Sequence, residues 1–337
     1  MKLMEMNPHL QLSVVMLGYC CSKNFRMALD HLRSQTVCSL LELIIVTPSR
    51  KKLDLAPSDL AGLSNYKILE LGVFKSEGAA KAAGVMAANT PLVAFLEDHS
   101  YPEPFWAEAL IDAHSKGNFA VVGPIMLNAN PYCGASWGAF LVFYGQWMRA
   151  RPQKEVKHLP GNHSCYNREL LLRYGPRVPE MLETESVLQW DLLDKGHRLY
   201  QEPRARVYHL NSSRLGQPLS EYYVSSRIFA TSRARHWNRI RRVLYALGSP
   251  LLPLIRLRRV LNDAGRAQLR IGVTLRALMT IFLTLCAGAA GEISGYAFGE
   301  GKARNDLLRI LDKRHLFYTP HDLEAASKVS RTPQLGD

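Results

Sequence analysis

The sequence lacks the cysteine patterns that bind metals or cross-link small secreted folds. No CxxC pair and no Cys/His spacing of a zinc site occurs among its six cysteines, which are Cys20, Cys21, Cys38, Cys133, Cys165 and Cys286. We therefore expect free thiols in a reducing compartment. Residues 1–9 contain no basic run followed by an apolar core, so we also expect no secretory signal there. The sequence has no internal repeat, which excludes repeat architectures.

Uninterrupted apolar runs long enough to cross a membrane are also lacking. Residues 277–291 supply only about 15 mostly apolar positions, against the ~20 that a spanning helix needs. Pro250 and Pro253 interrupt the other apolar stretch, residues 244–255. Because arginines flank both stretches, we expect a helical hairpin that lies in a membrane interface and does not span the bilayer.

Acidic residues are scarce in one part of the chain. The full sequence has 42 Lys and Arg against 29 Asp and Glu, a net charge of +13. Residues 227–276 alone hold twelve arginines and one acid, Asp263, so the remainder is nearly neutral. This segment predicts an anionic membrane surface as a partner, since each basic residue near such a surface adds ~1 kcal/mol.

Two other interpretations of the basic segment are a soluble helical subdomain packed on the rest of the chain and a nucleic-acid site. No groove-reading motif is visible, and aromatic residues are not interleaved as a stacking platform requires. We therefore expect no nucleic-acid partner.

The N-terminal two thirds of the chain alternates between apolar strands and helices. Strands are expected at residues 12–18, 41–46, 67–71, 92–96 and 120–122, and helices at 24–35, 76–89 and 104–114. This alternation predicts an α/β fold with a mainly parallel sheet flanked by helices. We expect irregular structure and a few strands at 128–165, a helix at 185–195, and short strands at 199–200 and 205–209.

A change of composition near residues 215–225 divides the chain. We expect a sheet domain at 10–220, a helical membrane-associating region at 221–317, and a flexible tail at 318–337 that has few apolar anchors. Five glycines in the helical region indicate close helix packing, because no strand precedes them as in a phosphate loop. They are Gly288, Gly291, Gly295, Gly299 and Gly301.

Three consecutive polar side chains, Glu97, Asp98 and His99, follow the strand expected at 92–96. Ligands of open α/β sheets bind beyond the carboxyl ends of the strands. Carboxylates suit Mg²⁺, and an imidazole shifts the preference towards Mn²⁺. This segment therefore predicts a site for a divalent metal.

Further motifs follow in a fixed order. After the strand–helix–strand pattern at 12–46 come Ala80-Lys81-Ala82, Phe95-Leu96-Glu97-Asp98-His99, Gly161-Asn162-His163, Glu185, Gly196-His197-Arg198 and Val207-Tyr208-His209. This ordered set, over residues 10–215, resembles the family 2 glycosyltransferases. The resemblance implies a GT-A fold, a nucleotide-sugar donor, a divalent Mn²⁺ or Mg²⁺, and inversion at the anomeric carbon.

The resemblance also implies roles for individual residues. Glu185 would be the base that deprotonates the acceptor hydroxyl, with Glu183 as the neighbouring candidate. The implied metal ligands are Glu97, Asp98, His99 and His209. The implied donor contacts are Thr47, Lys81, Glu97 and Asp98. The implied acceptor contacts are Asn162 and His163. Trp137, which follows a turn at residues 128–131, is either a residue that stacks on an acceptor ring or an ordinary half-buried tryptophan.

Some positions depart from the family pattern. Thr47 stands where an aspartate usually reads the nucleobase, and Lys81-Ala82 stands where the family has Arg-Asn. Lys81 keeps a cation for a phosphate but lacks the bidentate fork of arginine.

These features predict an inverting, metal-dependent glycosyltransferase peripheral to the cytoplasmic face of a membrane. Its acceptor would be lipid-linked or a polysaccharide of the cell envelope. One alternative is a non-catalytic nucleotide-sugar-binding or scaffold protein on a degenerate GT-A domain. Another is a nucleotidyltransferase, which would release pyrophosphate.

Overall fold

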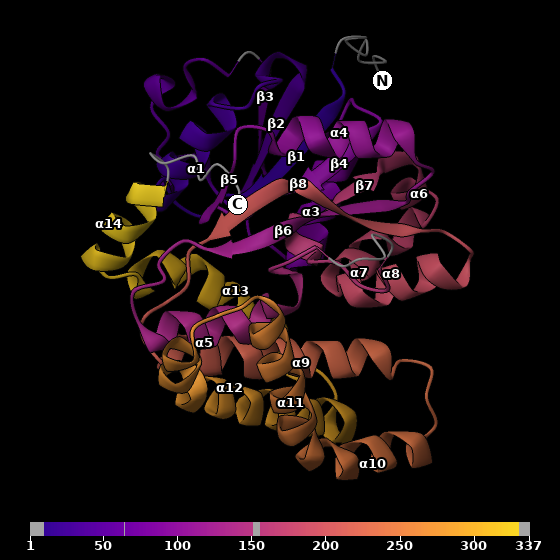
Figure 1. The fold of residues 1–337 in the computed structure, drawn as a ribbon. Coiled ribbons are helices and arrows are strands. Elements are labelled where there is room, and N and C mark those ends of the chain that lie inside the picture. The colour runs from indigo at the N-terminus through magenta and orange to yellow at the C-terminus, as the bar shows by residue number, and fades with distance from the viewer. Residues whose placement is uncertain (1–9, 64, 151–155, 330–337) are drawn as a thin grey trace. The chain divides into compact units, whose positions relative to one another are not determined.

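The structure is a computed structural model that describes residues 10–63, 65–150 and 156–329 (Figure 1). The chain divides into two compact units. The first comprises residues 1–125 and 150–208, and the second comprises residues 126–149 and 209–337. Residues 126–149, which lie inside the expected sheet domain at 10–220, therefore group with the helical region.

The first unit is built on an eight-stranded sheet in the order β3-β2-β1-β4-β7-β6-β8-β5. β1 pairs in parallel with β2 and β4, and β2 with β3, whereas β7 is antiparallel to β4 and β6. The α/β prediction is thus confirmed, with a mixed sheet. The strands are β1 (Leu12–Leu17), β2 (Leu41–Thr47), β3 (Tyr66–Glu70), β4 (Leu92–Phe95), β5 (Ser100–Pro102), β6 (Val121–Asn128), β7 (Cys165–Asn167) and β8 (Leu199–His209).

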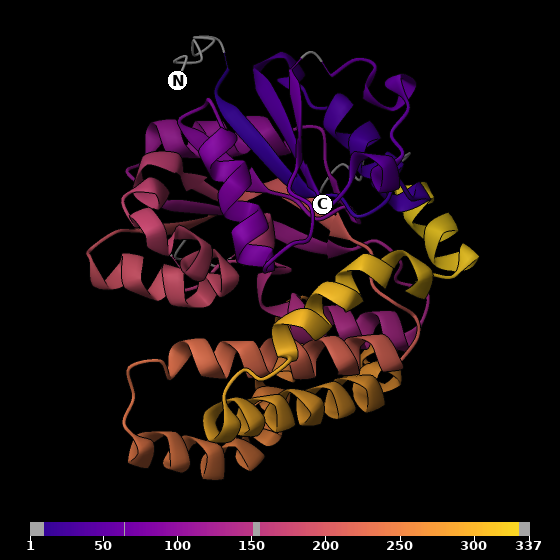
Figure 2. The same ribbon diagram turned by 180° about the vertical axis from the view of Figure 1, so that it is seen from behind.

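Helices flank this sheet, and glycines let one of them approach closely. The helix α3 packs against β1 and β2 and lies in front of the sheet in Figure 2. A Cβ on Gly84 would lie 2.4 Å from Val15, and one on Gly78 would lie 2.2 Å from the Pro179 carbonyl oxygen. The helices of this unit are α1 (Lys23–Arg33), α2 (Arg50–Leu53), α3 (Glu77–Ala87), α4 (Trp106–Lys116), α6 (Arg168–Leu172), α7 (Val178–Glu183) and α8 (Glu185–Asp194).

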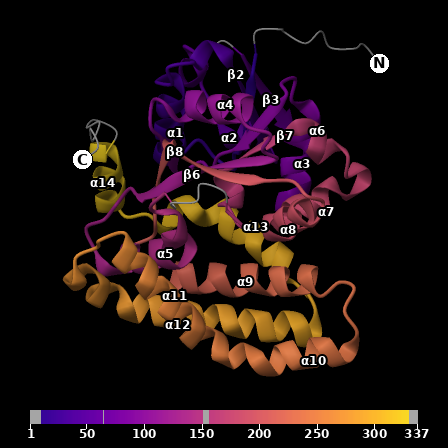
Figure 3. The same cartoon turned by 45° about the vertical axis from the view of Figure 1, so that its right-hand side comes forward.

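The second unit is helical, and its long helix α12 packs against α5, α9, α10 and α11 (Figure 3). An apolar cluster that includes Leu141, Val260, Ile281 and Leu285 joins α5, α11 and α12. The helices are α5 (Gly134–Phe143), α9 (Gly216–Arg233), α10 (Arg239–Gly248), α11 (Leu252–Arg266), α12 (Ile271–Phe298), α13 (Ala303–Lys313) and α14 (Pro320–Val329).

The predicted close packing of glycines is confirmed on α12. A Cβ would lie 2.3 Å from the Tyr222 ring at Gly288, 2.1 Å from the Tyr223 carbonyl oxygen at Gly291, and 2.5 Å from the Arg227 carbonyl oxygen at Gly295. Gly301 also lies against the Arg227 side chain. The prediction is wrong for Gly299, which has nothing within 4 Å and instead ends the helix with a φ of +74°.

We expect Gly291→Val to destabilise the protein by at least about 1–3 kcal/mol, because a rotamer change cannot relieve a clash with a backbone carbonyl. Gly272→Val is a matched control in the same helix, since a Cβ there meets nothing within 4 Å. Denaturant unfolding of both variants checks this. Equal midpoints would contradict the close α9–α12 packing.

Three segments differ from the sequence-based expectation. The irregular region at 128–165 contains the helix α5, and the two short strands at 199–200 and 205–209 form one continuous strand, β8. In the expected flexible tail, residues 320–329 form α14, whose buried Asp322 accepts hydrogen bonds from Asn130, Tyr132 and Ser213. This anchor is polar, so a search for apolar residues misses it.

Within the described residues, α12 is the helix that is long and apolar enough to cross a membrane by length and composition. It has 28 residues, and its most apolar 18 have a mean hydropathy of 1.8 with 33% of them buried. The helix extends beyond the apolar stretch at 277–291 on both sides.

Candidate functional site

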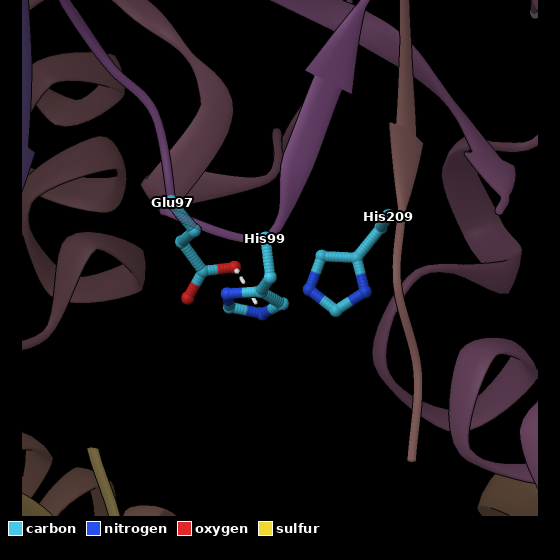
Figure 4. Close-up of side chains that lie close together, drawn as sticks. All are labelled: Glu97, His99 and His209. Atoms are coloured by element: carbon cyan, nitrogen blue, oxygen red, sulfur yellow. Dashed lines mark ion pairs between the residues drawn. The ribbon is translucent and has the colours of Figure 1, made fainter. Parts of the chain in front are cut away.

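A group of side chains able to hold a metal lies beyond the carboxyl end of β4. Glu97 and His99 follow this buried strand, and His209 is the last residue of β8 (Figure 4). One potential ligand atom from each of the three residues lies within 4.8 Å of the others. The sequence predicts all three as ligands, and the structure brings them together.

Hydrogen bonds orient both imidazole rings. The Asp98 carboxylate accepts from Nδ1 of His99 at 2.8 Å, which leaves Nε2 facing Glu97 Oε2 at 3.7 Å. Nδ1 of His209 lies 3.0 Å from the Asn211 side-chain oxygen, which directs its Nε2 to the group. A metal-binding histidine ordinarily has such a partner on its other ring nitrogen. Asp98, also predicted as a ligand, is outside this group of three and accepts from His99.

The residues present fit a divalent first-row metal. The donor set is one carboxylate and two imidazoles, and both rings are buried. Mg²⁺ prefers an all-oxygen shell, whereas imidazole ligands suit first-row transition metals. The donor set therefore fits a first-row transition metal better than Mg²⁺.

A buried ammonium group lies between two carboxylates close to this group. Nζ of Lys81 contacts Glu185 and also lies 2.8 Å from Glu77 Oε1, one turn earlier in α3. Glu185 is the first residue of α8, and Gly161 allows it close approach, since a Cβ there would lie 2.5 Å from the Glu185 Cβ. The predicted base thus lies in a tightly packed ion pair.

The surroundings shift the ionisation of this pair. Burial raises the pKa of Glu185, while the nearby Lys81 opposes that rise. Burial alone would lower the pKa of Lys81, but the carboxylates of Glu185 and Glu77 hold this pKa above its ordinary value. A carboxylate with a raised pKa is a better proton acceptor than an exposed one.

Asn162 connects the ion pair to the metal-binding group. Its side-chain oxygen accepts from Lys81, and its Nδ2 donates to Glu97 Oε1 at 3.0 Å. A continuous chain of contacts therefore runs from Glu185 through Lys81 and Asn162 to Glu97. Two carboxylates, those of Glu77 and Glu185, contact the single Lys81 ammonium directly.

His163 lies beneath Glu97 and is fully buried. Its Nε2 is 2.8 Å from Ser100 Oγ and 3.4 Å from Glu97 Oε2. The sequence predicts that His163 contacts the acceptor, but the buried ring is arranged to position Glu97.

Three other predicted residues lie in different surroundings. Glu183 Oε2 accepts from the backbone N–H of Gly78 in the first turn of α3, at 2.7 Å, which is a capping role. The Thr47 hydroxyl forms hydrogen bonds with the backbone N–H and carbonyl of Ser49. Trp137 belongs to α5 of the second unit, and its indole N–H donates to the Pro131 carbonyl.

Three supporting residues are not among those predicted from the sequence. Glu77 precedes Lys81 by four positions, a spacing typical of helical ion pairs, and this signal could have found it. Ser100 and Asn211, which hold His163 and His209, leave no comparable signal.

Among known proteins, a solved structure is similar to part of this chain. No family model matches the sequence, and no curated protein matches it. A solved structure described as GalNAc-T7 with UDP, GalNAc and Mn²⁺ is similar, with 16% sequence identity and a TM-score of 0.46. The similarity covers 59% of this chain but only 43% of that chain, less than half of its length. At this level it assigns neither an activity nor a substrate.

Proposed function

We propose that this protein is an inverting glycosyltransferase that moves a sugar from a nucleoside-diphosphate donor to an acceptor hydroxyl. The observation that carries this proposal is the chain of contacts from Glu185 to Glu97, because it joins a buried carboxylate base to a metal-binding group. The ordered motifs that resemble family 2 glycosyltransferases support it, and membership in that family is part of the proposal.

Each residue has a distinct task in this reaction. Glu185 accepts the proton of the acceptor hydroxyl as its oxygen attacks the anomeric carbon. Lys81 would exchange one of its three present contacts for a phosphate oxygen of the donor. Glu97, His99 and His209 would hold a divalent metal, which neutralises the charge that develops on the departing diphosphate. Asp98 and His163 keep His99 and Glu97 in position.

We propose a lipid-linked or polysaccharide acceptor of the cell envelope at the cytoplasmic face of a membrane. A lipid-linked acceptor and a polysaccharide acceptor would both present a sugar hydroxyl to Glu185, so the reaction itself does not separate them. Transfer from one donor to a panel of short-chain lipid-linked sugars and to soluble oligosaccharides separates them.

We expect donor binding to raise the unfolding temperature only when the metal is present. At a hundred times its dissociation constant, a donor adds about 2.7 kcal/mol of stability. The experiment heats the protein with each nucleotide sugar, with and without Mn²⁺. Glu97→Gln and His99→Ala should abolish the stabilisation by donor and Mn²⁺ together. Asp194→Asn, which changes an exposed carboxylate at the end of α8, should keep this stabilisation.

The products decide between this activity and its alternatives. Release of a nucleoside diphosphate supports glycosyl transfer, and release of pyrophosphate would identify a nucleotidyltransferase. Metal-dependent binding of a nucleotide sugar with no product would show a non-catalytic binding protein. No stabilisation by any donor would refute the donor site itself.

A further inference from the structure

Large apolar side chains are exposed on three neighbouring helices of the second unit. On α10, α11 and the first part of α12, side chains between 62% and 78% exposed include Ile240, Leu247, Leu254, Ile255, Ile271 and Met279. The helices α10 and α11 are joined by a short 3-10 turn, and both pack against α12. We call this exposed region the apolar face. Monomeric soluble proteins rarely expose so many large apolar residues together.

The exposed charges around the apolar face are positive. Residues 227–298 contain twelve arginines and no lysine, and their two acids are Asp263 and Glu292. Both acids are buried and paired, Asp263 with Arg266 at 3.4 Å and Glu292 with Arg256. Arginines on all three helices, among them Arg241, are exposed without a neighbouring acid of this segment.

Aromatic side chains accompany arginines where α9 leads into α10. The guanidinium carbon of Arg241 lies 4.1 Å from the centre of the Trp237 ring, and that of Arg233 lies 5.0 Å from the Tyr245 ring. Trp and Tyr with basic residues are typical of the interface between lipid and water.

The packing of α12 argues against a membrane-spanning orientation. Gly291 and Gly295 lie against the α9 backbone, and Glu292 pairs with Arg256 in the interior of the unit. The C-terminal half of α12 is therefore part of a helical core, and only its first part belongs to the apolar face. Spanning would require this core to open.

We propose that the apolar face binds the surface of an anionic phospholipid bilayer, with α10, α11 and the start of α12 lying in the headgroup region. Apolar side chains enter the boundary of the acyl chains while arginines contact lipid phosphates. Charge complementarity selects this occupant over a second copy of the chain, whose arginines would repel these. This inference does not depend on sugar transfer, because binding is measured without donor.

Vesicle sedimentation with the full-length protein tests the proposal. We expect binding to vesicles that contain phosphatidylglycerol and weak binding to pure phosphatidylcholine. Changing Leu247, Leu254 and Ile255 together to glutamine should weaken binding at least about 100-fold, because three buried apolar side chains are lost. Arg258→Gln with Arg259→Gln should weaken it about tenfold or more.

Matched controls use exposed residues of the first unit. Val73, which is 91% exposed, is changed to glutamine, and Lys51 and Lys52 are changed together. These variants should bind like the wild type. All altered residues are exposed, so circular dichroism and thermal unfolding should be unchanged.

Vesicle binding that is absent in the wild type, or equal in all variants, would overturn the proposal. Concentration-dependent dimers that the triple glutamine variant abolishes, without vesicle binding, would instead identify a second copy as the occupant.

Discussion

Glu185→Gln is expected to lower the rate of sugar transfer by ~10²–10⁴-fold, the usual contribution of a general base. Glutamine keeps the size of the side chain but cannot accept the proton of an acceptor hydroxyl. Donor binding should change only a few-fold, because Glu185 does not contact phosphate in the proposed reaction. Steady-state kinetics together with donor binding by calorimetry separates the two effects.

Glu183→Gln provides the matched control, since Glu183 is the other predicted base and lies two residues away. Its carboxylate accepts from the backbone N–H of Gly78, so this variant should lose some stability and keep its turnover. A normal rate for Glu185→Gln would refute the base assignment. The same large loss in Glu183→Gln alone would transfer the role to that residue.

Lys81→Met is expected to damage both stability and activity. This change removes the ammonium that Glu185 and Glu77 share. Their side chains are only 15% and 16% exposed, so water cannot fully replace it. Breaking a buried ion pair costs about 3 kcal/mol at the lower end of the usual range. Denaturant unfolding at neutral pH measures this loss.

The activity of Lys81→Met should depend strongly on pH. Burial already raises the pKa of Glu185, and removing the opposing charge of Lys81 raises it further. Because only the deprotonated carboxylate is a base, the loss is largest at low pH and diminishes as the pH rises. The acidic limb of kcat/KM should move upwards by ~1–3 units.

Lys81→Arg keeps the positive charge and is the control for this pH effect. Its acidic limb should stay near that of the wild type, even where the bulkier guanidinium reduces the rate. An equal loss for Lys81→Met at every pH would contradict an electrostatic effect on Glu185 and leave Lys81 with a phosphate contact alone.

The sheet and the polar residues that follow β4 could be predicted from the sequence because both depend on local patterns, whereas the place of His209 beside them follows only from the resemblance. The parallel strands are short apolar runs, and Glu97, Asp98 and His99 follow one of them directly. The distribution of roles among these residues could not be predicted. That Asp98 orients His99 depends on the ring rotamer, and that His163 lies beneath Glu97 depends on tertiary packing.

The contacts of Lys81 illustrate the same limit. Its position in a helix is visible in the sequence, and so is its spacing from Glu77. Its contacts with Asn162 and Glu185 join residues 81 and 104 positions apart, which no local pattern encodes. The α14 anchor at Asp322 is not visible in the sequence for a related reason, since a buried carboxylate with hydrogen-bond partners has the same sequence signature as a surface carboxylate.

The interleaved composition of the two units constrains how the chain folds during synthesis. The first unit has all its residues once position 208 has been made, whereas α5 of the second unit must wait for α12. Leu141 and Val142 of α5 pack in one cluster with Ile281 and Leu285. At ~5–20 residues per second, this apolar helix lacks its partner for on the order of ten seconds on the ribosome. During that interval the apolar surface of α5 is exposed to other chains, which favours aggregation.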